Sequence, residues 1–330
     1  MELLTGWLNE NGVKHSLDIE LSEFSYMKTG GKVFVLIEPA SSEEVSKCVA
    51  FLYSQNIKFK VIGATSNLLF LDDVDYSCFL TTAGLKELKL VDDAEFIAGS
   101  GHMLPDISRY ALYHSITGLE GLEGIPGTVG GAVFMNAGAY GYEIKNVLKA
   151  VEFVDLTGAI QEYSVEQLKL KKRNSALKSG ELSGIITKAW FRASLGNVSI
   201  IENKMEIYHS KRHKYQDFQF PNLGSMFSGS IYRALGNRDK YIYIMSTLFY
   251  LLNYKWKILR REAPLNRKWI NDIIIKRLNL KYDIQPFSNK TMNCLVNRGQ
   301  GTDEMIRYIE EIKTLTNNLI PIENEIVEKF

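Results

Sequence analysis

The most informative segment of the chain reads Gly118-Leu-Glu-Gly-Leu-Glu-Gly-Ile-Pro-Gly-Thr-Val-Gly-Gly-Ala-Val-Phe-Met-Asn-Ala-Gly-Ala-Tyr-Gly141. It holds eight glycines and one proline, and its only charged residues are Glu120 and Glu123. Because glycine lacks a Cβ and reaches positive φ freely, successive peptide N–H groups can turn toward one anionic group. The stretch therefore predicts a loop that approaches a ligand closely, and a phosphate-bearing cofactor is its natural occupant.

Two common phosphate-binding motifs do not match this stretch. No lysine follows the glycines as it would in the loop of a nucleoside triphosphatase, and the glycine spacing is not the fingerprint of a nicotinamide dinucleotide dehydrogenase. Both classes of enzyme therefore lose support.

The chain upstream of this stretch is predicted to alternate strands and helices. Residues 32–38 are rich in β-branched side chains, and residues 57–62 form a second predicted strand. Between them, Ser41 and the glutamate three residues later form a capping-box pattern ahead of apolar residues at helical spacing. This βαβ unit ends at Gly63-Ala-Thr-Ser-Asn67, where the end of a strand can present N–H groups to a phosphate. A further helix is predicted over residues 105–116.

Length, composition and charge predict a globular protein with a small-molecule partner. A chain of 330 residues with 45% hydrophobic content can bury two or three substantial cores. The 39 Lys and Arg residues balance 38 Asp and Glu residues, so no basic field argues for nucleic acid. The N-terminus has no basic head followed by an apolar core, so no signal peptide is predicted.

Neither cysteines nor histidines predict a metal site. Cys48, Cys78 and Cys294 lie far apart without a CxxC pair, which also argues against a disulfide framework and favours a reducing compartment. His209 and His213 have a helical spacing that suits a metal, but the lysines around them repel a cation.

Two more segments, Thr29-Gly-Gly31 and Ala98-Gly-Ser-Gly101, form an ordered series with loop 63–67 and the stretch 118–141. In this order they resemble the MurB family, the flavin-dependent UDP-N-acetylenolpyruvoylglucosamine reductases of bacterial peptidoglycan synthesis. The resemblance implies an α+β protein. It would combine a FAD-binding fold of the vanillyl-alcohol-oxidase (PCMH) type, built of two α/β subdomains, with a C-terminal substrate domain of the MurB type. In that fold the flavin pyrophosphate lies between two glycine-bearing loops.

The second half of the chain carries further landmarks of the family. Lys211-Arg-His-Lys-Tyr-Gln216 and Pro221-Asn-Leu-Gly-Ser-Met-Phe227 are similar to the MurB C-terminal domain. Residues 288–297 match a strand of that domain, and residues 301–315 match its last helix, with Thr302 as the expected cap.

The resemblance covers roughly residues 20–230 and 269–327. It implies a FAD-binding domain over residues 1–195 and a substrate-binding domain over residues 196–330, the latter interrupted by an atypical insertion at about 231–268.

The family's activity implies a UDP-N-acetylmuramate dehydrogenase. Such an enzyme reduces UDP-N-acetylglucosamine enolpyruvate to UDP-N-acetylmuramate with noncovalently bound FAD, and NADPH is the hydride donor. The expected protein is a cytoplasmic monomer that binds a small sugar nucleotide and no nucleic acid.

Three residues match catalytic positions of the family. Ser225 stands at the position of the general acid that protonates the enolate left after hydride transfer. Arg173 matches the arginine that holds the enolpyruvyl carboxylate with its planar fork of donors, and Glu325 matches the catalytic glutamate. The residues implied in FAD binding are Gly63, Ala64, Thr65, Ser66, Asn67, Pro126, Gly127, Thr128, Gly130, Gly131, Asn136, Ala137 and Gly138.

The chain departs from the family pattern at two places near these residues. Thr65 stands in a glycine slot of the first loop, where a positive φ would strain it. After Ser225, the segment Ser228-Gly-Ser230 replaces a family segment that holds a substrate-binding asparagine. Two alternatives therefore stay open: a MurB-like flavin oxidoreductase that acts on a different sugar nucleotide or acid, and a non-catalytic flavin-binding paralogue.

The insertion contains an uncharged run, Tyr241-Ile-Tyr-Ile-Met-Ser-Thr-Leu-Phe-Tyr-Leu-Leu-Asn-Tyr254. Fourteen residues are too few for a transmembrane helix, which needs about 20. Three interpretations remain: a lid over the substrate, a buried packing element, and an attachment to a membrane interface through residues 241–254.

Overall fold

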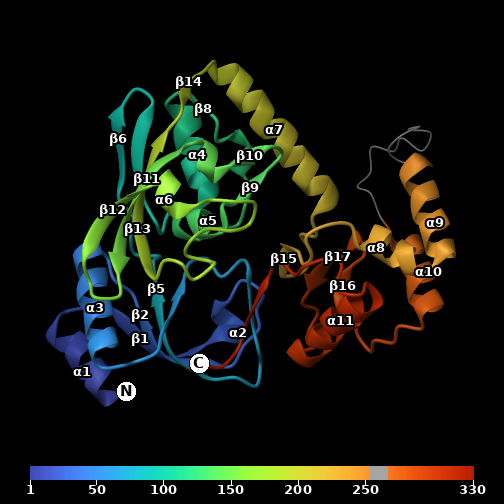
Figure 1. The fold of residues 1–330 in the computed structure, drawn as a ribbon, viewed down its shortest axis with the longest axis horizontal. Helices are drawn as coiled ribbons and strands as arrows, with labels where there is room; N and C mark the ends of the chain where they lie inside the picture. The colour runs from blue at the N-terminus through green and yellow to red at the C-terminus, as the bar shows by residue number, and fades with distance from the viewer. Residues whose placement is uncertain (253–266) are drawn as a thin grey trace.

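The computed structural model describes residues 1–252 and 267–330, and its first part is built on a four-stranded sheet in the order β1-β2-β5-β3 (Figure 1). Strands β2 and β3 both run parallel to β5, one on each side of it, and α3 connects them. The predicted βαβ unit is therefore confirmed, with β5 between its two strands, although its second strand begins at residue 60 rather than 57. Ser41 caps α3, because its Oγ accepts a hydrogen bond from the N–H of Glu44 at 3.2 Å. The elements are α1 (Glu2–Glu10), β1 (His15–Glu20), α2 (Leu21–Phe24), β2 (Lys32–Ile37), α3 (Ser42–Ser54), β3 (Lys60–Ile62), β4 (Leu68–Phe70) and β5 (Tyr76–Thr81).

The second part is an antiparallel sheet of five strands in the order β12-β11-β13-β7-β6. Helices α4 and α5 supply Ile107 and Val133 to its core, where they lie with Phe96, Phe153 and Phe191 of the sheet. The predicted helix at 105–116 is confirmed as α4, which ends three residues early. The elements are β6 (Leu88–Asp92), β7 (Glu95–Gly99), α4 (Leu104–Tyr113), β8 (Ile116–Thr117), η1 (Glu120–Leu122), α5 (Val129–Met135), β9 (Gly138–Ala139), β10 (Tyr142–Glu143), η2 (Ile144–Asn146), β11 (Leu148–Asp155), β12 (Ile160–Ser164), α6 (Val165–Leu168), β13 (Gly184–Arg192) and β14 (Ser194–Leu195).

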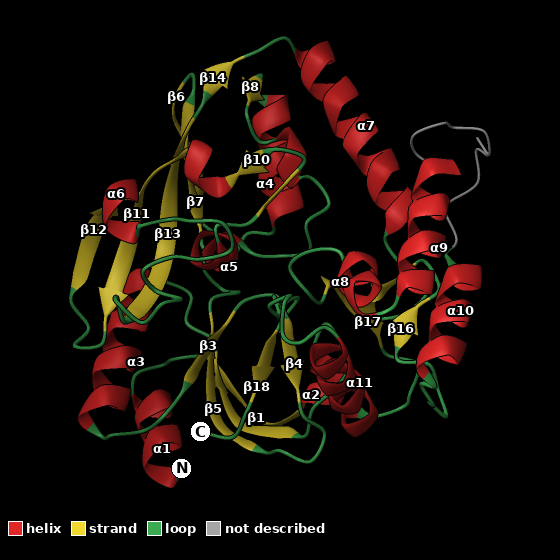
Figure 2. Ribbon diagram, turned by 45° about the vertical axis from the view of Figure 1, so that its right-hand side comes forward, coloured by secondary structure: helices red, strands yellow, loops and turns green. Residues whose placement is uncertain are grey.

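Helix α7 (Val198–Tyr215) leads from the second part to the third, as Figure 1 shows. The third part is a small sheet in the order β15-β17-β16, surrounded by α8, α9, α10 and α11 (Figure 2). Its core holds Phe227, Phe287 and Tyr308, all fully buried. The elements are β15 (Asn222–Ser225), α8 (Ile231–Arg238), α9 (Lys240–Tyr250), α10 (Lys268–Leu278), β16 (Phe287–Ser288), β17 (Thr291–Val296) and α11 (Thr302–Leu315).

The predicted cap of the last helix is wrong by one residue. Gly301 is the N-cap of α11, and Thr302 is its first helical residue. The Thr302 hydroxyl instead accepts a hydrogen bond from the N–H of Asp72 at 2.9 Å, and its own N–H donates to Asp72 Oδ2 at 2.8 Å. This contact with the loop after β4 ties the third part to the first.

The last strand of the chain returns to the first part. Strand β18 (Glu325–Val327) pairs in parallel with β4 (Figure 2). The boundary between the two predicted domains, at residue 195, stays a prediction. Strand β18 follows that boundary in the sequence but pairs with β4 of the first part.

The described part of the insertion up to residue 252 contains two helices, α8 and α9. Helix α8 places Ile231, Ala234 and Leu235 in the core of the third part, whereas α9 buries only Ile242 and Phe249. The last two residues of the uncharged run 241–254 lie outside the described residues. Within the described part of the chain, no helix combines the length and the apolar character that a bilayer crossing requires.

Candidate functional site

A cavity of about 1030 Å³ lies where the three parts of the structure meet. Its walls come from both glycine-bearing segments, from β15 and β17, and from the segment just before β18. Ser225, Arg173 and Glu325 all line it, although they lie far apart in the sequence. Of the residues predicted to bind FAD, those lining the cavity are Gly63, Ala64, Thr65, Ser66, Asn67, Pro126, Gly127, Thr128, Gly130, Gly131, Ala137 and Gly138.

The loop between β3 and β4 presents unpaired main-chain donors to this cavity. Among the described residues, the N–H groups of Ala64, Thr65 and Ser66 have no acceptor. Successive free N–H groups around a residue with positive φ form a concave site for an anion. A Cβ added at Gly63 would overlap Thr128 Oγ1, so the close approach of the two loops requires glycine there.

Thr65 adopts the positive φ that the sequence analysis linked to strain, at 55°. Its hydroxyl offsets part of that cost, because Thr65 Oγ1 accepts a hydrogen bond from the N–H of Tyr26 at 2.8 Å. The side chain is buried, with 5% of its surface exposed, and it points to the chain before Thr29-Gly-Gly31. The Thr65 side chain therefore links the loop between β3 and β4 to the segment that contains Tyr26.

We expect Thr65→Val to lower the free energy of unfolding by about 1–2 kcal/mol, because it removes the acceptor for Tyr26 and keeps a branched Cβ at positive φ. Thr65→Ser keeps the hydroxyl and serves as the matched control. Chemical denaturation of the three proteins measures the difference. Equal losses in both variants would contradict the role of the hydroxyl.

The glycines after Thr128 contribute space rather than hydrogen-bond donors. The N–H of Gly130 donates to the Ser100 carbonyl at 2.9 Å, and the N–H of Gly131 donates weakly to Thr128 Oγ1 at 3.4 Å. A Cβ at Gly130 would lie 2.9 Å from Ser100 Cβ. The main chain of α5 can therefore pack closely at the cavity wall.

Asn136 is the one predicted cofactor residue that does not line the cavity. It ends α5 in the left-handed conformation and is 1% exposed. Its amide donates to Glu143 Oε2 at 3.1 Å and to the Lys171 carbonyl at 3.0 Å, and its oxygen accepts from the Lys145 N–H at 3.1 Å. Both polar atoms of the Asn136 side chain therefore form hydrogen bonds within the protein, where they join three segments of the fold.

The C-terminal segment reaches the cavity by pairing beside the first glycine loop. The N–H of Glu325 donates to the Asn67 carbonyl at 2.9 Å, and the carboxylate of Glu325 forms an ion pair with Lys60, the first residue of β3. The Asn324 amide donates to Asn67 Oδ1 at 2.9 Å and to the Leu223 carbonyl at 3.2 Å. The Asn67 side chain therefore joins the first glycine loop to the C-terminal segment. Through Asn324, that segment also contacts β15.

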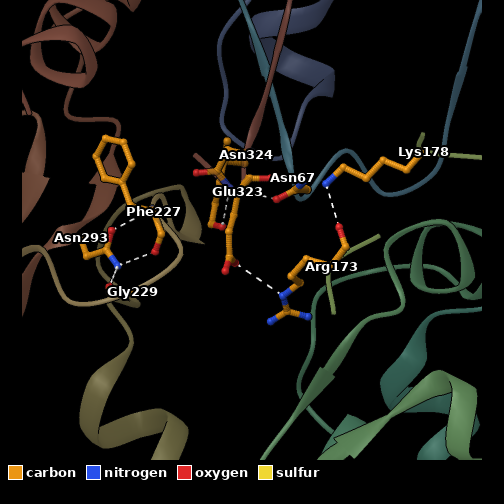
Figure 3. Close-up of polar contacts among 9 residues, drawn as sticks. Asn67, Arg173, Lys178, Phe227, Gly229, Asn293, Glu323 and Asn324 are labelled. Atoms are coloured by element: carbon orange, nitrogen blue, oxygen red, sulfur yellow. Dashed lines mark hydrogen bonds and ion pairs between the residues drawn. The ribbon is translucent and has the colours of Figure 1, made fainter. Parts of the chain in front are cut away.

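Ser225 is the last residue of β15. Asn293 of β17 contacts Phe227 and Gly229 in the segment that follows it (Figure 3). Asn293 Oδ1 accepts from the Phe227 N–H at 2.8 Å, and its amide donates to the carbonyls of Phe227 at 2.9 Å and Gly229 at 3.3 Å. Among the described residues the Ser225 hydroxyl has no hydrogen-bond partner, and its residue is exposed to the cavity. It is therefore available to a ligand.

Arg173 adopts a positive φ of 54°, an unusual conformation for a residue with a Cβ. Its Nε lies 3.5 Å from Glu323 Oε2, and its carbonyl accepts from Lys178 Nζ at 3.1 Å (Figure 3). Desolvation lowers the pKa of Lys178 from its usual value, an effect that the carboxylates of Glu325 and Glu323 oppose. Arg173 is thus the centre of a group of charges drawn from two distant segments.

Sequence reasoning missed Glu323 and Arg212. Glu323 lines the cavity and lies two residues before Glu325, so strand alternation would have placed both on one face. Arg212 also lines the cavity and is only 7% exposed. Its Nη2 donates to the Gly121 carbonyl at 3.0 Å, while its Nε has no partner among the described residues. Burial lowers the pKa of Arg212, and no sequence signal separates it from the lysines near it in the chain.

Comparisons with known proteins agree with this arrangement. A family model described as "FAD binding domain" matches residues 34–164. The UDP-N-acetylenolpyruvoylglucosamine reductase of Staphylococcus aureus (strain COL) is 35% identical over 214 residues, which cover 65% of this chain and 69% of that protein. Its counterpart from strain Newman is 34% identical over the same length.

The crystal structure of UDP-N-acetylenolpyruvylglucosamine reductase (MurB) from Thermus caldophilus has the same fold. It matches with a TM-score of 0.67 and 23% identity, and the match covers 96% of this chain and 99% of that one. The predicted α+β fold of the FAD-binding type is therefore confirmed. Together with the identity to the Staphylococcus aureus proteins, these findings show that the chain belongs to the MurB family of UDP-N-acetylenolpyruvoylglucosamine reductases.

Proposed function

We propose that this protein is a FAD-dependent reductase that converts UDP-N-acetylglucosamine enolpyruvate to UDP-N-acetylmuramate, with NADPH as the hydride donor, in the synthesis of peptidoglycan precursors. One observation carries the proposal: Ser225, Arg173 and Glu325 line the same cavity as the two glycine-bearing segments. Family membership and the matched FAD-binding domain support the same activity.

The residues of the cavity fit FAD. The free N–H groups of Ala64, Thr65 and Ser66 suit the pyrophosphate, and the glycines after Pro126 leave room for the cofactor beside them. The buried guanidinium of Arg212 lacks a carboxylate within ion-pair distance among the described residues, so it favours a negatively charged group of the cofactor or the substrate. When bound, the flavin supplies the hydride for the reduction.

Residues of the chain supply the remaining steps. Arg173 would bind the enolpyruvyl carboxylate through its guanidinium, oriented by Glu323. After hydride has reached the terminal carbon, the Ser225 hydroxyl would give its proton to the adjacent carbon, and solvent would restore it. Glu325, fixed by Lys60 and by the pairing of β18 with β4, would complete the polar wall beside the reacting carbons.

Three further features belong to the same proposal. The substrate is a sugar nucleotide, the chain acts as a cytoplasmic monomer, and the FAD-binding and substrate-binding domains divide near residue 195. Most of the buried residues in the core of the third part follow residue 195, which supports that division, although Met27 and Leu69 of the first part join this core.

A steady-state assay tests the function. Purified protein should oxidise NADPH only when UDP-N-acetylglucosamine enolpyruvate is present, and mass spectrometry should find a product heavier by two hydrogen atoms. If NADPH reduces the bound flavin but this substrate leaves it reduced, the protein acts on a different compound.

A further inference from the structure

Helices α8, α9 and α10 carry an excess of basic residues on a protein of nearly neutral charge. The chain as a whole has a net charge of +1. Residues 231–252 and 267–278 carry seven basic side chains against two acidic ones. The basic residues are Arg233, Arg238, Lys240, Arg267, Lys268, Lys276 and Arg277, and the acidic ones are Asp239 and Asp272.

Both acids in this region are already paired. Asp239 Oδ2 accepts from Arg277 Nε at 2.7 Å, and Asp272 lies 2.7 Å from Lys268 Nζ. Arg233, Arg238 and Lys240 are exposed and lie along α8 and at the start of α9. Among the described residues, the exposed Arg233, Arg238 and Lys240 therefore add positive charge beyond the two acidic side chains.

The outer face of α9 is apolar, which is unusual for a solvent-facing helix surface. Ile244 is 58% exposed, Leu248 is 40% exposed and Tyr243 is 54% exposed. Positions 240, 244, 247, 248 and 251 follow the helical repeat and share one face, and Lys240 is the only charged residue on it. A solvent-facing stripe would normally be charged or polar.

This face does not serve the cavity. Ile231 and Tyr232 of α8 line the cavity, but no residue of α9 does. Of the three interpretations of the uncharged run, the lid stays a prediction, and among the residues of α9 packing in the core accounts for Ile242 and Phe249. In Figure 1, α9 lies at the outer edge of the molecule, away from the two sheets of the FAD-binding part.

We propose that α9 and the basic residues around it bind the surface of a membrane that contains anionic lipids. Ile244 and Leu248 would enter the boundary between headgroups and acyl chains, tyrosines would lie at headgroup level, and the basic residues would contact lipid phosphates. The combination of exposed apolar side chains with an unneutralised positive charge favours this occupant over an apolar protein groove. The proposal is independent of the proposed reaction.

Vesicle co-sedimentation of the full-length protein tests this proposal. We expect binding to vesicles of phosphatidylcholine with phosphatidylglycerol, much weaker binding to phosphatidylcholine alone, and weakening by salt. The double variant Ile244→Ser/Leu248→Ser should bind at least about tenfold more weakly, and so should Arg238→Glu/Lys240→Glu. Leu195→Ser, which changes a residue 58% exposed on β14, is the matched control.

Secondary structure and flavin absorbance show whether each variant is still folded. All variants should keep the secondary structure and the flavin absorbance of the parent, because neither pair lines the cavity. Absence of binding to anionic vesicles, or equal binding by the Ile244→Ser/Leu248→Ser variant, would overturn the proposal. A dimer in size-exclusion chromatography that this variant abolishes would overturn it in favour of a contact between copies.

Discussion

Replacing Ser225 by alanine is expected to lower turnover about a thousandfold or more while the bound flavin is still reduced by NADPH. The hydroxyl has no partner among the described residues and faces the cavity, so its loss removes the proton donor without breaking a contact of the fold. Stopped-flow absorbance separates the two halves of the reaction: the bleaching phase should be unchanged, and the return of colour after substrate addition should be slow.

Ser228→Ala is the matched control for Ser225→Ala. Ser228 lies in the same turn, but its N–H is engaged with the Pro321 carbonyl at 2.8 Å and it does not line the cavity. Its replacement should leave turnover near that of the parent protein. Normal turnover of Ser225→Ala would remove the serine from the mechanism.

The second large effect is expected at Arg173. Arg173→Met should lower kcat/KM about a hundredfold or more, because the variant loses the charge-assisted hydrogen bonds between the half-buried guanidinium and the substrate carboxylate. Arg173→Lys should recover only part of the loss, since an ammonium group cannot reproduce the planar fork. Steady-state kinetics with varied enolpyruvyl substrate measures both values.

Lys172→Met controls for the removal of a positive charge at this place in the chain, because Lys172 is exposed and does not line the cavity. It should keep kcat/KM close to the parent value. If Arg173→Met behaves like Lys172→Met, Arg173 does not touch the substrate.

Short-range sequence patterns predicted those features of the site that depend on residues close together in the chain. The glycines at 63–67 and 118–141 required close main-chain approach, and both segments line one cavity. Capping at Ser41 and the βαβ order also follow from short-range rules. The glycine slot raised the question of a strained φ at Thr65, and the structure shows that φ is positive there. The hydrogen bond from Tyr26 that offsets the strain joins distant segments.

Tertiary pairing decided what local patterns could not predict. The placement of Glu325 depends on a three-residue strand that pairs with β4 at the opposite end of the chain. Asn136 carries a side chain suited to ligand binding, yet the fold uses every one of its polar atoms. Arg212 looks like part of a basic surface in the sequence, and only the packing of α7 against η1 buries it.

If the cavity holds FAD and the flavin reduces an enolpyruvyl sugar nucleotide, the purified protein is yellow. Absorbance near the flavin bands, recorded without oxygen, measures this colour. We expect NADPH to bleach the protein and UDP-N-acetylglucosamine enolpyruvate to restore the colour. A colourless protein that does not take up added FAD, or a bleached protein whose colour this substrate fails to restore, would rule the reaction out.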